Sequence, residues 1–162
     1  MWIRRDAKMY GNEFTKGGVS LSTADFARAE AQMGKSLPEG LKEFLLSVNG
    51  GVPERTYWPI DGGEFLWVKR FLSLIDSLGR GPTIEQSYLN GQQRAFLPSD
   101  LIPFAIDHGG NFFCLDEAGR VYFYAVDAWS PDATFEANVQ HAKSYLTVEI
   151  RAFIEGLEPD EA

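Results

Sequence analysis

Three short runs of apolar and β-branched residues, separated by two tight polar turns, constrain the fold of this chain more than any other feature. The runs are Ile102–Ile106, Asn111–Leu115 and Arg120–Val126. The turns between them, Asp107–Gly110 and Asp116–Gly119, are rich in aspartate and glycine, which favour tight reversals of the chain. Because strands joined by such short turns pair with their neighbours, the pattern predicts an antiparallel meander.

The residues before this meander have a different spacing, which is typical of amphipathic helices. Ser22 is a good N-cap, and Gly34 would end the helix that follows it. The apolar face of this helix would be formed by Phe26, Ala29 and Met33. A second helix is expected after Ser36-Leu37-Pro38-Glu39, which matches a capping box, and before Asn49-Gly50-Gly51. Its apolar residues recur at helical spacing: Leu41, Phe44, Leu45 and Val48.

Shorter elements complete the predicted architecture. Tyr57–Ile60 and Phe65–Val68 favour a pair of strands, and Thr83–Leu89 favours a short helix. Residues 1–21 predict only an irregular or hairpin-like lead-in, and Glu158–Ala162 a frayed tail. An apolar stripe predicts a C-terminal helix: Leu146, Ile150, Phe153, Ile154 and Leu157. The order of elements predicts one α+β domain, in which an antiparallel β-sheet has N-terminal helices and a C-terminal helix packed against it.

The chain is acidic, and its acidic residues are unevenly distributed. Asp and Glu number 23 against 15 Lys and Arg, which gives a net charge of −8 and argues against direct nucleic-acid binding. Residues 96–138 hold seven acidic residues against Arg120 alone, a net charge of −6. This field would attract a basic partner and speed its association, although acidic residues more often serve only to keep a surface solvated.

Composition also indicates where in the cell the protein is expected. No apolar run approaches the ~20 residues that a membrane-spanning helix needs, and the first residues do not have the apolar stretch of a secretory signal. Cys114 is the single cysteine, which excludes an internal disulfide. We therefore expect a cytoplasmic protein that does not bind membranes.

Candidate catalytic residues are few. Cys114 and His108 could form a Cys–His nucleophile, but a cysteine between two large apolar residues is more often an inert part of the core. Asp107–Gly110 is ordinary turn chemistry, and the paired glycines lack the lysine and helix of a phosphate loop. Asp116 and Glu117 have no positioned partner for acid–base chemistry. The sequence predicts no catalytic residue, no cofactor and no metal site.

Two blocks of short motifs resemble a known family. The first block is Leu37-Pro38, Leu41, Phe44-Leu45 and Asn49-Gly50-Gly51. The second comprises Leu101-Ile102-Pro103-Phe104-Ala105, Gly109-Gly110, Phe113-Cys114-Leu115-Asp116, Gly119 and Val121-Tyr122. In order and spacing they resemble the SUKH superfamily, the group that includes the yeast cell-wall assembly regulators. The resemblance covers about residues 22–157, and it implies one SUKH-like domain over residues 1–162.

The resemblance also implies a function. Bacterial members of the superfamily are immunity proteins that bind and neutralise toxin domains, often nucleases, whereas the yeast members are regulatory hubs. Its signature residues form the fold and assign no catalytic role. We therefore expect an immunity protein without enzymatic activity, whose partner is a basic toxin domain. The alternative is a non-enzymatic regulatory scaffold that binds a cellular protein.

Two kinds of residue are predicted to contact the partner. Tryptophans beside turns or prolines often anchor interfaces, and carboxylates in the acidic segment would face a basic toxin. The predicted contact residues are Trp58, Asp107, Asp116, Glu117, Asp127, Trp129 and Asp132. For both tryptophans the alternative is that they only cover the core.

Overall fold

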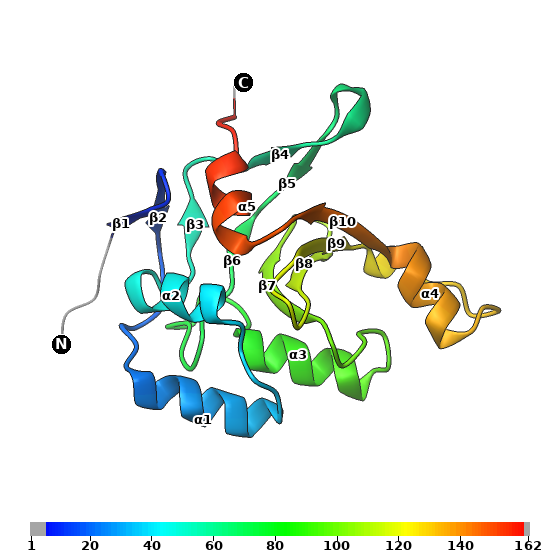
Figure 1. The fold of residues 1–162 in the computed structure, drawn as a ribbon, viewed down its shortest axis with the longest axis horizontal. Helices are drawn as coiled ribbons and strands as arrows, with labels where there is room; N and C mark the ends of the chain where they lie inside the picture. Colours follow the sequence, from blue (N-terminus) through cyan, green and yellow to red (C-terminus); the bar gives the residue numbers. More distant parts are fainter. Residues whose placement is uncertain (1–5, 161–162) are drawn as a thin grey trace.

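A five-stranded antiparallel sheet forms the centre of the protein (Figure 1), whose computed structural model describes residues 6–160. Its strands lie in the order β10-β9-β8-β7-β6. Their bounds are β6 (Arg70–Phe71), β7 (Ile102–Ile106), β8 (Phe112–Leu115), β9 (Val121–Tyr124) and β10 (Lys143–Thr147). The pairing of β7 with β8 and of β8 with β9 is antiparallel, which confirms the meander predicted from the sequence.

Two smaller sheets flank the central one. The predicted lead-in is a hairpin, in which β1 (Asp6–Met9) pairs with β2 (Asn12–Thr15), and β2 pairs in turn with β3 (Val52–Pro53). The other sheet is the hairpin of β4 (Tyr57–Pro59) and β5 (Phe65–Trp67). It projects from the body of the molecule at the upper right of Figure 1.

Five helices surround the sheets in the described part of the chain. They are α1 (Thr23–Met33), α2 (Glu39–Ser47), α3 (Ile84–Gln93), α4 (Phe135–Ala142) and α5 (Ile150–Gly156). In Figure 1, α1 and α3 lie below the central sheet, α5 lies above it, and α4 lies beyond its right-hand end. The mixed α+β class and the C-terminal helix are therefore as predicted. None of these helices is long and apolar enough to cross a membrane.

Aromatic side chains join the layers of the core. Phe153 of α5 packs on Phe104 and Phe113 of the sheet, with ring centroids 5.6 and 5.3 Å apart. On the side of α2, Phe44 contacts Phe14 and Phe71, at 5.3 and 5.4 Å. Each of these six side chains is at most 2% exposed, so α2, α5 and the sheet form one core.

The starts of the two N-terminal helices differ from each other. At α1, the backbone N–H of Ser22 donates to Asp25 Oδ2 at 2.8 Å, and Gly34 ends the helix at a φ of 67°, as predicted. The capping box predicted at Ser36 is wrong, because α2 begins after Pro38 with no side-chain cap. The N–H of Leu37 instead donates to the carboxylate of Glu30 at 2.7 Å, so a residue of α1 supplies the acceptor.

The C-terminal third departs most from the prediction. Leu146 was expected on the last helix, but it lies in β10, which pairs with β9, and α5 starts only at Ile150. Helix α4 was not predicted. The expected frayed tail lies partly outside the described residues. At its start, the N–H of Glu158 donates to the Tyr57 carbonyl at 2.7 Å, so this residue is bound to β4.

Candidate functional site: an acidic lobe at one end of the sheet

Residues 125–142, which connect β9 to β10, form a separate lobe that we call the α4 lobe. It contains the 3-10 turn η2 (Val126–Ala128), a loop and α4. Thr134 caps α4, because its hydroxyl accepts from the N–H of Ala137. The buried Asn138 side chain closes the loop, since it accepts from the Ser130 N–H and donates to the Ser130 carbonyl, at 2.7 and 2.9 Å.

The surface of the α4 lobe combines carboxylates with an aromatic pair. Asp127, Asp132 and Glu136 are exposed, and none takes part in an ion pair within residues 6–160. Trp129 is half-buried and meets Phe135 edge-on, with centroids 5.7 Å apart, while Phe135 remains 38% exposed. The lobe therefore offers unpaired negative charge beside accessible aromatic area.

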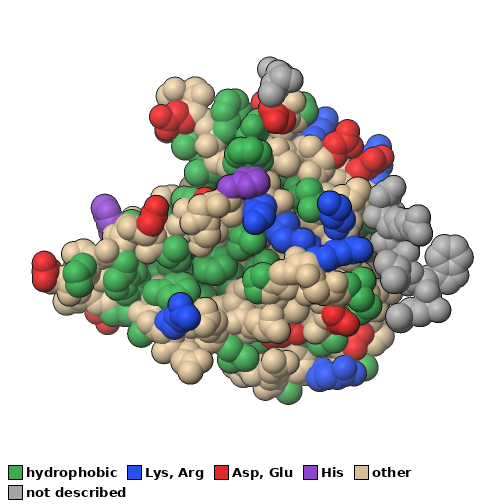
Figure 2. Space-filling view, turned by 180° about the vertical axis from the view of Figure 1, so that it is seen from behind, with side chains coloured by type: hydrophobic (Ala, Val, Ile, Leu, Met, Phe, Trp, Pro, Cys, Tyr) green, Lys and Arg blue, Asp and Glu red, His purple; other side chains and the backbone are tan. Residues whose placement is uncertain are grey.

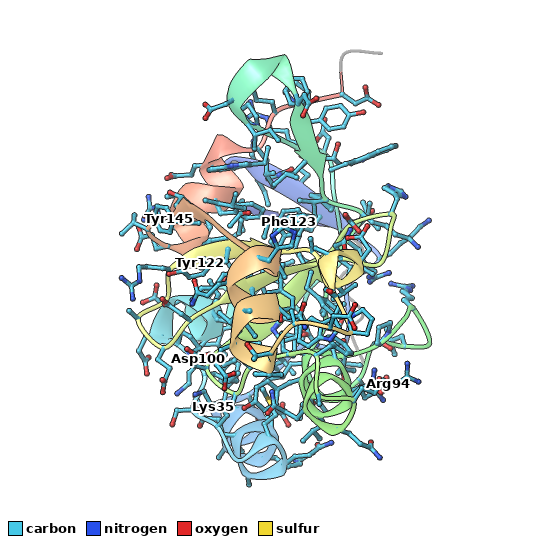
Figure 3. The ribbon with its side chains drawn as sticks, turned by 90° about the vertical axis from the view of Figure 1, so that its right-hand side faces the viewer. Lys35, Arg94, Asp100, Tyr122, Phe123 and Tyr145 are labelled. Atoms are coloured by element: carbon cyan, nitrogen blue, oxygen red, sulfur yellow. The ribbon has the colours of Figure 1, made fainter. Side chains whose placement is uncertain are left out.

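The lobe stands in front of the central sheet when the molecule is viewed from the right of Figure 1 (Figure 3). Tyr122 of β9 and Tyr145 of β10 contact each other, with ring centroids 5.7 Å apart, and the Tyr122 hydroxyl donates to Asp116 Oδ2 at 3.2 Å. Tyr145 is 57% exposed. This tyrosine pair therefore lies next to the β8–β9 turn and is distinct from the aromatic pair of the lobe.

Asp107 lies at the same end of the sheet as the α4 lobe, but its carboxylate is already occupied. Its Oδ1 accepts from the N–H groups of Gly109 and Asn111, at 2.9 and 2.8 Å, and its Oδ2 accepts from the Asn111 amide. The same Asn111 side chain accepts from the N–H of Val126 at 2.9 Å. Asp107 thus fixes the β7–β8 turn, and through Asn111 that turn is joined to the lobe.

Asp116 and Glu117 lie away from the lobe. Successive turns of a meander are at opposite ends of the strand between them, and a strand as long as β8 separates its ends by roughly 13 Å. Asp116 accepts from the Arg120 N–H at 2.9 Å and from Arg120 Nε at 2.8 Å. Burial would raise the pKa of Asp116, but these bonds and the charge of Arg120 hold it below its usual value. Glu117 is exposed and 3.1 Å from Lys35 Nζ.

Trp58 lies on the projecting hairpin and faces the core. Its ring stacks on Phe153 at 5.0 Å, and a Cβ added to Gly156 would come within 2.6 Å of it. The opposite face of the hairpin presents residues that the sequence analysis did not single out. Phe65 and Trp67 are 50% and 45% exposed, and alternation along the strand around Leu66 was the signal that could have found them.

The two residues considered for nucleophilic catalysis have different surroundings. Cys114 has no exposed surface, and burial raises the pKa of its thiol strongly. His108 is exposed, and its ring centroid lies 4.1 Å from that of Trp67. A buried, protonated thiol is a poor nucleophile, so this pair does not form a reactive dyad. Within residues 6–160 no three His, Cys, Asp or Glu side chains are grouped so that they could hold a metal ion.

These features define a small α+β protein whose candidate functional groups lie on exposed surfaces. The four predicted contacts that the structure brings to one end of the sheet are Asp107, Asp127, Trp129 and Asp132. The model of the SMI1 / KNR4 family (SUKH-1) matches residues 20–146, and the chain belongs to this family. The family is generally non-enzymatic and includes toxin-immunity proteins. A search of the curated proteins finds no match.

Proposed function

We propose that this protein is a cytoplasmic immunity protein that binds and neutralises a cognate toxin domain, a nuclease with a basic surface. The observation that carries the proposal is the α4 lobe, with its exposed carboxylates and its Trp129–Phe135 pair. Membership of a family that includes immunity proteins supports it.

The lobe would act by occlusion. A nuclease holds the phosphate backbone with lysine and arginine side chains, which release counterions when they are neutralised. Asp127, Asp132 and Glu136 would engage the same cations and steer the two proteins together. Trp129 and Phe135 would supply desolvated contact area, which slows dissociation.

The test is co-expression with the toxin encoded beside this gene, with cell survival as the readout. Wild type should protect, and the triple variant Asp127→Lys, Asp132→Lys, Glu136→Lys should not. Full protection by the triple variant would remove the lobe from the mechanism. If no neighbouring toxin exists and no candidate is neutralised, the protein is better described as a regulatory scaffold.

A further inference from the structure

Two arginine side chains, Arg70 and Arg80, lie close to each other, and we call them the basic cluster. Neither takes part in an ion pair within the described residues, although the protein as a whole carries a net charge of −8. Figure 2 shows lysine and arginine side chains gathered beside a band of apolar ones on the face opposite to that of Figure 1.

Backbone carbonyl groups hold the two arginines of the cluster close together. Arg70 Nη2 donates to the carbonyl of Lys16 at 3.1 Å, and Arg80 Nη1 donates to the carbonyl of the next residue, Gly17, at 3.0 Å. Partial burial and the charge of Arg80 lower the pKa of Arg70, which shows that the two guanidinium groups repel each other. Like charges fixed in this way favour the binding of an anion, because the anion relieves the repulsion.

An apolar groove begins beside the cluster. It has a volume of about 450 Å³ and lies between α3 and the β7–β8 turn. Pro82, Ile106 and Phe112 are among its lining residues. A Cβ on Gly81, the residue before Pro82, would lie 3.9 Å from Arg70 Cδ, so the arginine is next to this end of the groove.

We propose that the basic cluster and this groove together bind an acidic segment of a protein partner. Carboxylates of the segment would pair with Arg70 and Arg80, and a bulky apolar side chain a few residues away would enter the groove. The site shares no lining residue with the α4 lobe, although the β7–β8 turn contacts both, and it does not require the partner to be a toxin. A nucleic acid fits less well, because the net charge of −8 repels a phosphate backbone and most of the exposed lining of the groove is apolar.

Binding is tested with a fluorescent peptide that combines aspartate and glutamate with one leucine. The control peptide has asparagine and glutamine in their place. The double variant Arg70→Gln, Arg80→Gln should bind the acidic peptide at least about tenfold more weakly, with a smaller dependence on salt. The charge-matched control Lys8→Gln, Arg55→Gln changes two exposed cations on or next to the N-terminal sheet and should bind like wild type.

The groove is tested separately by filling it. Asn90 lines the groove, whereas Gln93 is exposed on the same helix and does not. Asn90→Trp should weaken the binding of the leucine-containing peptide but not that of an all-acidic peptide. Gln93→Trp should change the binding of neither. The proposal is overturned if the acidic peptide does not bind, or if both double variants lose binding equally. It is also overturned if single-stranded DNA binds more tightly than the peptide and depends on the same cations.

Discussion

The side chain of Asn49 fixes the chain as it leaves helix α2, directly before two glycines. Its amide donates to the carbonyls of Val19 and Leu74, at 2.8 and 3.0 Å, and its Oδ1 accepts from the Leu74 N–H at 2.7 Å. The chain must then turn back within two residues against β2 and β6. Gly50 and Gly51 have φ values of 75° and 117°, in the region of positive φ that favours glycine.

We predict that Gly51→Ala destabilises the protein more than Gly34→Ala. Both glycines have positive φ, so each alanine costs about 1–2 kcal/mol of backbone strain. At Gly34 the added Cβ meets nothing within 4 Å, but at Gly51 it would lie 2.4 Å from the Thr15 carbonyl oxygen. The clash should add about 1–3 kcal/mol in a denaturant melt. Equal losses would show that the backbone yields easily here.

Asp116 gives a prediction with a defined pH dependence. Because its folded-state pKa lies below its value in the unfolded chain, the ionised carboxylate stabilises the fold. This stabilisation is complete above about pH 4, near the unfolded pKa, and is lost as the pH falls through the lower folded pKa. Asp116→Asn should therefore lose about 1–3 kcal/mol at pH 7 and progressively less in acid.

Urea melts between about pH 2 and 7 measure this difference. The exposed Asp127, changed to asparagine, is the control and should alter the free energy of unfolding by less than about 0.5 kcal/mol. A deficit of Asp116→Asn that stays constant with pH would mean that the charge of Asp116 does not contribute.

Helix α2 carries the clearest prediction about a secondary-structure element. Phe44 is 1% exposed between Phe14 and Phe71, so Phe44→Ala should cost ~3–5 kcal/mol through lost transfer energy and the cavity left behind. Leu46 is on the same helix but 47% exposed, and Leu46→Ala should cost less than about 1 kcal/mol. Similar losses for the two variants in a thermal or urea melt would contradict the assignment of the core face.

The elements predicted correctly were those in which local signals and burial agree. In α1 and in the meander, turn residues and apolar spacing indicate the same boundaries, and the structure follows them. Residues 135–147 do not behave in this way. Helix α4 buries little beyond Asn138, Val139 and Ala142, and the exposed pattern of β10 is that of an edge strand, so periodicity alone could not separate helix from strand.

Part of the candidate site was predictable from the sequence, because some of its residues are close together in the chain. Trp129, Asp127 and Asp132 were found because they are close in sequence and fold into one lobe. Asp107 and Asp116 belong to the same acidic segment of the sequence. Their carboxylate oxygens, however, accept hydrogen bonds within their own turns, so reversing their charge would also damage the fold. Only the three-dimensional arrangement shows that Arg70 and Arg80, which are ten residues apart, lie together.

Three exposed carboxylates of the α4 lobe lie at one end of the molecule. The α4 lobe is at one end of the central sheet, while the N-terminal hairpin and α2 lie at the other (Figure 1). Long-range attraction to a basic partner depends on where the negative charge is, and not only on its total. Two variants with the same net charge should therefore differ if the lobe steers association.

The last prediction compares such variants by stopped-flow measurements of their association with the toxin that the protein neutralises. Reversal of Asp127, Asp132 and Glu136 to lysine should slow association about tenfold or more at low salt and reduce its salt dependence. The matched control reverses three exposed glutamates, Glu13, Glu43 and Glu54, which lie in the N-terminal hairpin, in α2 and directly after β3. It should slow association far less, because these elements lie at the other end of the molecule from the lobe and salt screens distant charges. Equal slowing by both sets would mean that net charge alone governs the encounter, and the lobe would then have no special role in it.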